Sequence, residues 1–260
     1  MTKLKDIEKL TIQLETILIL LFRFRFLNRT QLQLLLHHKS KTKIILWLNG
    51  LTEKKYISRF YLKTVASDAA VYCLNTPSKK YLTKYCLKEV KASLLYRIYT
   101  ERERSPIFRR HCMFVADIYL SLFSLCEKNN ALLKFLTQND LHGMKYLVNP
   151  HPDCYFSITE KSGSTKRYFL DVIDIYPIED ELVQRVHQYF GYYQKGFWQK
   201  NNANPFPEIL LICAENRAKN FLTAVIKKRL KDDSPTFSLS TWADIKEKGI
   251  TRSVLYTVIK

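Results

Sequence analysis

The sequence predicts two domains: a winged helix-turn-helix at residues 1–99 and an α/β domain at residues 107–241. The chain as a whole is therefore expected to be of the α+β class. Three helical stripes near the N-terminus are followed by two short segments that read as strands. Beyond residue 106, a long helical pattern precedes aromatic strands, a further helix and an uninterrupted apolar run. The basic charge is asymmetric, because residues 1–105 carry 21 Lys and Arg against 8 acids and residues 106–260 carry 21 against 16.

Composition indicates a globular protein with a polyanionic partner. The formal net charge is +18, and 47% of the residues are hydrophobic, which is typical of folded chains that bind nucleic acid. Six cysteines form no Cys-x-x-Cys pair, so we expect small buried thiols in a reducing, cytoplasmic compartment. The apolar run Ile17–Phe22 is far shorter than the roughly 20 residues that span a bilayer. We expect no membrane partner, since every long amphipathic segment has a core role.

The first part of the chain predicts three short helices. Apolar residues at helical spacing end near Phe24, and the next helix starts at Asn28, where Gln31 predicts a capping box. A third helix follows Ser40, and its apolar stripe consists of Ile44, Trp47, Leu48 and Leu51. Three short helices in close succession fit a helix-turn-helix core.

Two strand-like segments follow the third helix. Lys55–Lys63 alternates polar and apolar residues, and Ala70–Leu74 reads as a second strand after a small polar loop at Thr64–Ala69, which predicts the hairpin, or wing, of a winged helix. Thr76 and Pro77 then mark a helix start. That helix is expected to run to about Tyr99.

The third helix of such a motif enters the major groove of DNA with its N-terminal residues against bases and phosphates. The residues expected at these contacts are Lys41, Thr42 and Lys43. Phosphate contacts from the wing and the turn before it are expected from Lys54, Lys55, Arg59 and Lys63. The alternative is a winged helix that only pairs with proteins, in which these lysines form a solvated face.

A linker is expected at residues 100–106, where charges alternate before a proline. A strongly periodic helix follows from Phe108 and ends at Glu127–Asn130. Leu132–Leu136 then predicts an edge strand.

A hairpin of aromatic strands carries a carboxylate within an apolar run. Asp171 shares one strand face with Phe169 and Ile173. With the hairpin centred on Gly163, Asp153 lies opposite Ile173 and diagonal to Asp171, at roughly 7 to 8 Å. Two carboxylates at that separation can share one divalent cation.

Further elements complete this domain. Glu179–Gln194 predicts a helix with an acidic first turn, and Ile209–Cys213 is typical of a central strand. A helix capped by Asn216 and a last strand at Thr236–Ser240 follow. Residues 242–260 are expected to be a C-terminal extension of short helices.

The acidic hairpin resembles the PD-(D/E)xK nuclease superfamily, in which an acid opens one strand, a second acid lies in the next, and a lysine follows two residues later. Asp153 and Asp171 occupy the acidic positions, and Ile173 stands where the lysine belongs. More narrowly, the segment from Tyr168 to Asp174 resembles the replication-relaxation family, together with Arg185 and Tyr189 of the next helix. That family joins a winged helix to a restriction-endonuclease-like domain and includes some plasmid mobilisation relaxases.

This resemblance implies an αβββαβ nuclease-like core and, if the site is active, Mg²⁺ or Mn²⁺ as its cofactor. The catalytic residues that it implies are Asp153, Asp171, Arg185 and Glu127, and the metal ligands are Asp153, Asp171 and, after a β-bulge, Asp174. The family's usual Glu-x-Asp strand motif is replaced by Asp171-Val172-Ile173. Metal-dependent cleavage needs a group that activates the nucleophile, and neither isoleucine nor a guanidinium does so at neutral pH. We therefore expect a weak or inactive nuclease.

The expected function is that of a double-stranded-DNA-binding protein in the replication or mobilisation of a plasmid or mobile element. Other replication or mobilisation proteins and a second copy of the chain are its further expected partners. The alternative is a winged-helix transcriptional regulator whose second domain serves dimerisation or partner binding.

Overall fold

The computed structural model describes residues 9–61, 70–87, 92–174, 178–250 and 254–259. The chain divides into two compact units, Met1–Ala116 (unit 1) and Asp117–Lys260 (unit 2). The division falls inside the long helix α6 (Pro106–Asn129), later than the expected linker. Within the described ranges, none of the helices combines the length and apolar character that crossing a membrane requires.

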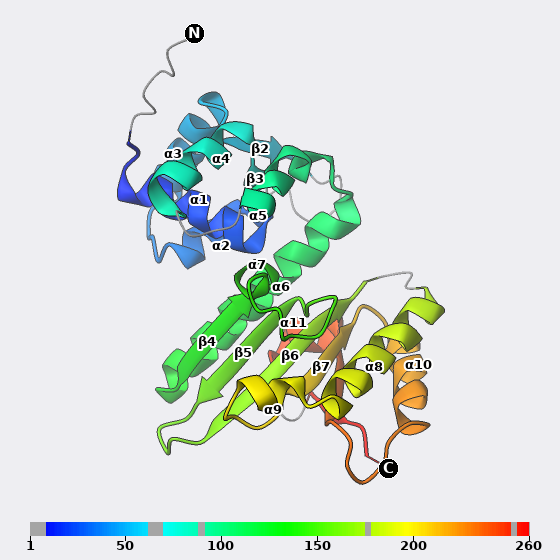
Figure 1. Cartoon of the computed structure of the whole chain (residues 1–260). Helices are drawn as coiled ribbons and strands as arrows, with labels where there is room; N and C mark the ends of the chain where they lie inside the picture. Colours follow the sequence, from blue (N-terminus) through cyan, green and yellow to red (C-terminus); the bar gives the residue numbers. More distant parts are fainter. Residues whose placement is uncertain (1–8, 62–69, 88–91, 175–177, 251–253, 260) are drawn as a thin grey trace. The chain divides into compact units, whose positions relative to one another are not determined.

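Unit 1 combines three helices with a small antiparallel sheet (Figure 1). The helices are α1 (Ile12–Phe24), α2 (Arg29–Leu35) and α3 (Lys41–Glu53), and the sheet order is β1 (Leu27–Asn28), β3 (Val71–Leu74), β2 (Ile57–Phe60). The expected strand pair is present, since β2 pairs antiparallel with β3. The capping box of Asn28 and Gln31 opens α2 as predicted. Strand β1 was missed, because two residues show no alternation.

The expected single helix from Thr76 to Tyr99 is wrong, since the described residues of this segment, which exclude 88–91, form short helical pieces. They are α4 (Thr76–Tyr81), the π-helical η1 (Leu82–Cys86), α5 (Ala92–Tyr96) and the 3-10 turns η2 (Arg97–Tyr99) and η3 (Glu101–Glu103). Helix η1 ends because Leu87 leaves the helical region, at φ −128° and ψ 50°. Glu101, inside the expected linker, is buried and forms an ion pair with Arg25, so it packs within unit 1.

Unit 2 is built on a six-stranded mixed sheet in chain order. The strands are β4 (Leu132–Thr137), β5 (Cys154–Thr159), β6 (Thr165–Ile173), β7 (Glu208–Cys213), β8 (Phe237–Thr241) and β9 (Tyr256–Thr257). Strands β4, β5 and β6 pair antiparallel, and β7 and β8 continue parallel to β6. Together with α6 and α8, the first four strands give the predicted αβββαβ order.

Helices cover both faces of this sheet (Figure 1). On one face lie α8 (Glu179–Gln194), α9 (Phe197–Asn201) and α10 (Asn216–Lys227); on the other lie the second half of α6 and α11 (Trp242–Lys248). The short α7 (Gln138–Leu141) follows β4. The bounds of α8 are those predicted. Strand β7 is buried from Ile209 to Cys213, as expected of a central strand.

Residues 242–260 complete the sheet in addition to forming a short helix. Strand β9 pairs antiparallel with β8 and becomes the edge strand, and Val254 and Val258 are buried. The strand expected at Thr236–Ser240 is therefore not the last one. Two residues carry no alternation, so only the pairing with β8 identifies β9.

Candidate functional site

Asp171 is placed by β6 on the sheet face that α8 covers. As predicted, it shares that face with Phe169 and Ile173, which belong to the same apolar core as Tyr189 of α8. Asp171 is itself buried. A carboxylate in such a core requires partners, because an unpaired buried charge is strongly destabilising.

Arg185 of α8 supplies most of these partners. Its Nε donates to Oδ2 of Asp171 at 2.6 Å and its Nη2 donates to Oδ1 at 3.0 Å. The two side chains are only 14% and 8% exposed. A bidentate guanidinium–carboxylate pair of this kind is among the stronger hydrogen-bonded arrangements in proteins.

Tyr189, one helical turn after Arg185, faces the same carboxylate. Its hydroxyl donates to Oδ2 of Asp171 at 2.9 Å and accepts from Nη2 of Arg185 at 3.1 Å. The remaining guanidinium nitrogen of Arg185, Nη1, donates to the carbonyl oxygen of Pro150 at 2.6 Å and to Oε1 of Gln188 at 3.3 Å. Arg185 therefore ties α8 to both β6 and the segment before β5.

Asp153 lies beside Asp171, but through a register that differs from the prediction. Ile158 pairs with Lys166 and not with Tyr168, because the connecting loop is centred on Ser162. The amide of Gly163 donates to the carbonyl of Glu160, and Gly163 adopts φ +82°, a left-handed conformation that glycine permits at the end of such a turn. The expected register, centred on Gly163, is thus wrong by two residues.

This register brings Asp153 level with Asp171. The backbone amide of Asp153 donates to Oδ1 of Asp171 at 3.3 Å, and the amide of Val172 donates to Oδ2 of Asp153 at 2.8 Å. The two acids are therefore neighbours in the folded chain. Each also accepts a backbone hydrogen bond from the strand end that carries the other.

The lone pairs of Asp171 are already occupied. Its two oxygens accept from Nε and Nη2 of Arg185, from the Tyr189 hydroxyl and from the Asp153 amide, and a carboxylate has about four lone-pair sites. The described residues contain no cluster of three or more His, Cys, Asp or Glu side chains that could hold a metal ion. As arranged, this site does not fit Mg²⁺ or Mn²⁺.

The surroundings of Asp171 shift the pKa values of its two side-chain donors, Arg185 and Tyr189. Burial lowers the pKa of Arg185, but the charge and hydrogen bonds of Asp171, together with Tyr189 and the charge of Asp153, outweigh burial and raise this pKa above its ordinary value. Burial raises the pKa of Tyr189 well above its ordinary value, and Asp171 adds to that effect. Arg185 is thus a permanent cation and Tyr189 a neutral donor, so neither acts as a base or a nucleophile near neutral pH.

Asp174 and Glu127 are not brought into this cluster. The β6–β7 register is continuous from Tyr168 to Ile173, so no β-bulge there turns Asp174 toward Asp171. Glu127 is exposed near the end of α6. That half of α6 covers the opposite sheet face, as the contact of Tyr119 with Phe135 indicates.

The sequence analysis named Arg185 and Tyr189 but did not foresee that Pro150 and Gln188 would also contact Arg185. Arg185 and Tyr189 are four residues apart and so project from one face of α8. This spacing could have predicted that both side chains contact Asp171. The contacts of Arg185 with Pro150 and Gln188 carried no comparable signal. The Pro150 partner is a backbone carbonyl, which any residue provides.

The residues expected to contact DNA lie on the surface of unit 1. Lys41, Thr42 and Lys43 are exposed in the first turn of α3, which the Ser40 side chain caps by accepting from the Lys43 amide. Lys54, Lys55 and Arg59 are also exposed, and Lys63 lies outside the described residues. Arg59 donates to Oδ1 of Asn49 on α3 at 3.4 Å.

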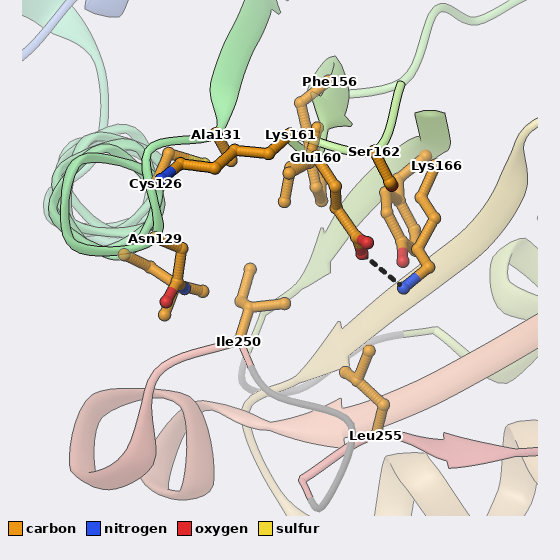
Figure 2. A pocket seen from close by; sticks show the side chains of 13 residues that line it. Cys126, Asn129, Ala131, Phe156, Glu160, Lys161, Ser162, Lys166, Ile250 and Leu255 are labelled. Carbon is orange, nitrogen blue, oxygen red and sulfur yellow. Dashed lines mark hydrogen bonds and ion pairs between the residues drawn. The ribbon is translucent and has the colours of Figure 1, made fainter. Parts of the chain in front are cut away.

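Unit 2 also contains a cavity of about 510 Å³, away from the acidic cluster. Its wall includes Phe156 and Tyr168, which lie on the sheet face opposite Asp171. Figure 2 shows Glu160 and Lys166 pointing toward each other at this cavity, joined by an ion pair of 3.2 Å.

Comparison with known proteins finds a matching family model and similar solved structures. The family model for replication-relaxation matches residues 18–209. The structure of restriction endonuclease FokI is similar at 15% identity and a TM-score of 0.28, covering 93% of this chain and 45% of that one. The structure of FokI bound to DNA is similar at 14% identity and a TM-score of 0.28, covering 97% and 48%. The chain thus spans less than half the length of these structures, and a search of curated proteins finds no match.

Proposed function

Because this chain belongs to the replication-relaxation family, we propose that it is a DNA-binding protein that serves the replication or mobilisation of a plasmid or mobile element. Unit 1 is a winged helix that holds double-stranded DNA. Unit 2 is a nuclease-like domain without cleavage activity.

The observation that supports DNA binding is the exposed first turn of α3. Lys41 and Lys43 flank Thr42 at a helix N-terminus, where backbone amides and the helix dipole also favour phosphate. Arg59 lies on β2, the strand after α3, and reaches α3 through Asn49. These side chains suit phosphate contacts on both sides of a helix in the major groove.

The observation that supports an inactive unit 2 is the occupation of Asp171. Cleavage through a divalent cation requires carboxylate oxygens that accept the metal. In this chain Arg185 and Tyr189 take those oxygens, and Ile173 supplies no proton-transfer group. The pair of Arg185 and Asp171 therefore stabilises the fold and also leaves Asp171 unable to bind the cation that cleavage requires.

The test of DNA binding is the salt dependence of affinity for duplex DNA. Each neutralised phosphate contributes about 0.9 to the slope of log affinity against log salt, so Lys41→Ala with Lys43→Ala should reduce the slope by about two units. Lys227→Ala with Lys228→Ala removes two exposed charges from unit 2 and is the matched control. An unchanged slope in the α3 variant would contradict the proposed surface. Bound fragments from the host genome should contain a replication or transfer origin, whereas promoters would favour a transcriptional regulator.

The test of inactivity uses supercoiled and single-stranded DNA with Mg²⁺ or Mn²⁺. We expect neither substrate to be cleaved by the parent protein or by the variant with Asp153→Ala and Asp171→Ala. Nicking by the parent that disappears in this variant would make the chain an enzyme.

A further inference from the structure

Two solvent-exposed tyrosine rings of unit 1 lie close to one lysine. Tyr96 is 66% exposed and Tyr99 is 41% exposed, and their ring centroids lie 5.0 Å apart at 65°. The Nζ atom of Lys79 lies 4.8 Å from the Tyr96 centroid and 4.6 Å from the Tyr99 centroid. The three side chains form one aromatic and cationic cluster.

Buried neighbouring residues anchor the backbone that carries the two tyrosines. Leu95 and Ile98, which alternate with the two tyrosines, are buried, and Arg97 donates to the carbonyl of Phe22 at 2.8 Å. The backbone that carries the rings at positions 96 and 99 is therefore anchored, with both rings on the outer side of α5 and η2. A tyrosine side chain has only two χ angles, so little conformational entropy is lost when a ligand packs against its ring.

Further cationic residues lie on the segment that carries Lys79. Lys80 and Lys84 are exposed on α4 and η1, the same segment that carries Lys79. Residues 1–105 as a whole carry 21 Lys and Arg against 8 acids. An anionic ligand with flat apolar groups matches this combination of charge and ring.

Single-stranded DNA has this chemistry. Its unpaired bases stack on aromatic side chains, and its phosphates follow cationic residues. In duplex DNA the bases are already stacked on one another within the helix, so they offer no free face on which the tyrosine rings could stack. We propose that Tyr96, Tyr99 and Lys79 form a binding site for single-stranded DNA, which is distinct from the α3 surface and rests on the proposed function only in that the protein acts on DNA.

The experiment measures the affinity of the full chain for labelled oligothymidylate and for an abasic oligonucleotide of the same length. The parent should prefer oligothymidylate, because only this ligand has bases to stack. One stacked base contributes a free energy that corresponds to roughly a 5- to 160-fold change in affinity. The variant with Tyr96→Ala and Tyr99→Ala should therefore lose about tenfold or more on oligothymidylate and little on the abasic strand.

Two further variants control for folding and for exposed rings in general. Tyr96→Phe with Tyr99→Phe keeps the rings and should bind like the parent. Tyr256→Ala removes a similarly exposed ring, 42% exposed, that also lies near a lysine, Lys219 at 5.9 Å. It should leave affinity for oligothymidylate unchanged.

Equal binding of both oligonucleotides by the parent, or an unchanged affinity in the double alanine variant, would overturn this site. The outcome is independent of the α3 surface, since Lys41→Ala with Lys43→Ala should weaken duplex binding and keep the preference for bases over abasic sites. If the parent does not bind duplex DNA but still prefers oligothymidylate to the abasic strand, only the proposed function is contradicted.

Discussion

Two buried arginine–carboxylate pairs, one in each unit, have nearly the same geometry. Arg25 donates to Glu101 at 2.6 and 3.0 Å in unit 1, and Arg185 donates to Asp171 at 2.6 and 3.0 Å in unit 2. The side chains are 13% and 3% exposed in the first pair and 14% and 8% exposed in the second. Distance and burial therefore do not distinguish them.

Their surroundings differ. The Arg25 guanidinium lies 4.3 Å from the Phe108 ring centroid, and burial together with the nearby Arg25 charge lowers the pKa of Arg97 to about 10. Arg185 lies instead at a pair of adjacent acids, Asp153 and Asp171. The first pair ties η3 to the end of α1, whereas the second occupies oxygens of a carboxylate that lies beside another carboxylate. The same interaction thus joins two helical elements in unit 1 and belongs to a two-carboxylate cluster in unit 2.

Loss of one cation gives the largest expected effect. Arg185→Ala leaves Asp171 buried without its two guanidinium bonds, which typically costs about 3–5 kcal/mol. Urea unfolding followed through the buried Trp198 should show a free energy of unfolding lowered by that amount. Arg25→Ala is the matched change in unit 1, followed through Trp47 of α3, and should cost about as much.

A double variant separates the charge from the packing. Arg185→Met with Asp171→Leu removes both charges and should be more stable than Arg185→Ala, because no unpaired carboxylate stays buried. A loss below about 1 kcal/mol for Arg185→Ala, the average for any substitution, would show that Asp171 does not depend on Arg185.

The pairs Arg25–Glu101 and Arg185–Asp171 should also differ in whether a divalent cation binds once the arginine is removed. In Arg185→Ala the oxygens of Asp171 become available beside Asp153, and with a Kd on the order of 1 mM, Mn²⁺ at about 10 mM would stabilise the variant by about 1.4 kcal/mol. The thermal midpoint should rise in this variant and stay constant in the parent. It should also stay constant in Arg25→Ala, since that change frees a single carboxylate. A shift of equal size in the parent would contradict the occupation of Asp171.

The supporting aromatic residues give the smallest expected effect. Tyr189→Phe removes one hydrogen bond to Asp171 and should lower the free energy of unfolding by about 1 kcal/mol. Phe108→Leu removes the ring beside Arg25 and should cost about as much in unit 1. Urea unfolding measures both. A loss for Tyr189→Phe as large as that for Arg185→Ala would assign the stabilisation of Asp171 to tyrosine.

The sequence by itself determined the elements whose signals lie within a few residues. Three acids in its first turn and an apolar stripe predicted α8 with its observed bounds, and Asn28 with Gln31 predicted the start of α2. Period-two alternation placed Asp171 on the face of Phe169 and Ile173. These signals are local because capping and alternation depend on the backbone of neighbouring residues.

Only the tertiary structure decided which groups meet across elements. The loop around Ser162 set the hairpin register and so placed Asp153 beside Asp171. The pairing of β9 with β8 brought the C-terminal segment into the sheet. The packing of α8 on β6 gave Asp171 its arginine partner. Such contacts join residues far apart in the chain, and their geometry follows from the packing of a whole sheet against its helices, which no short stretch of sequence encodes.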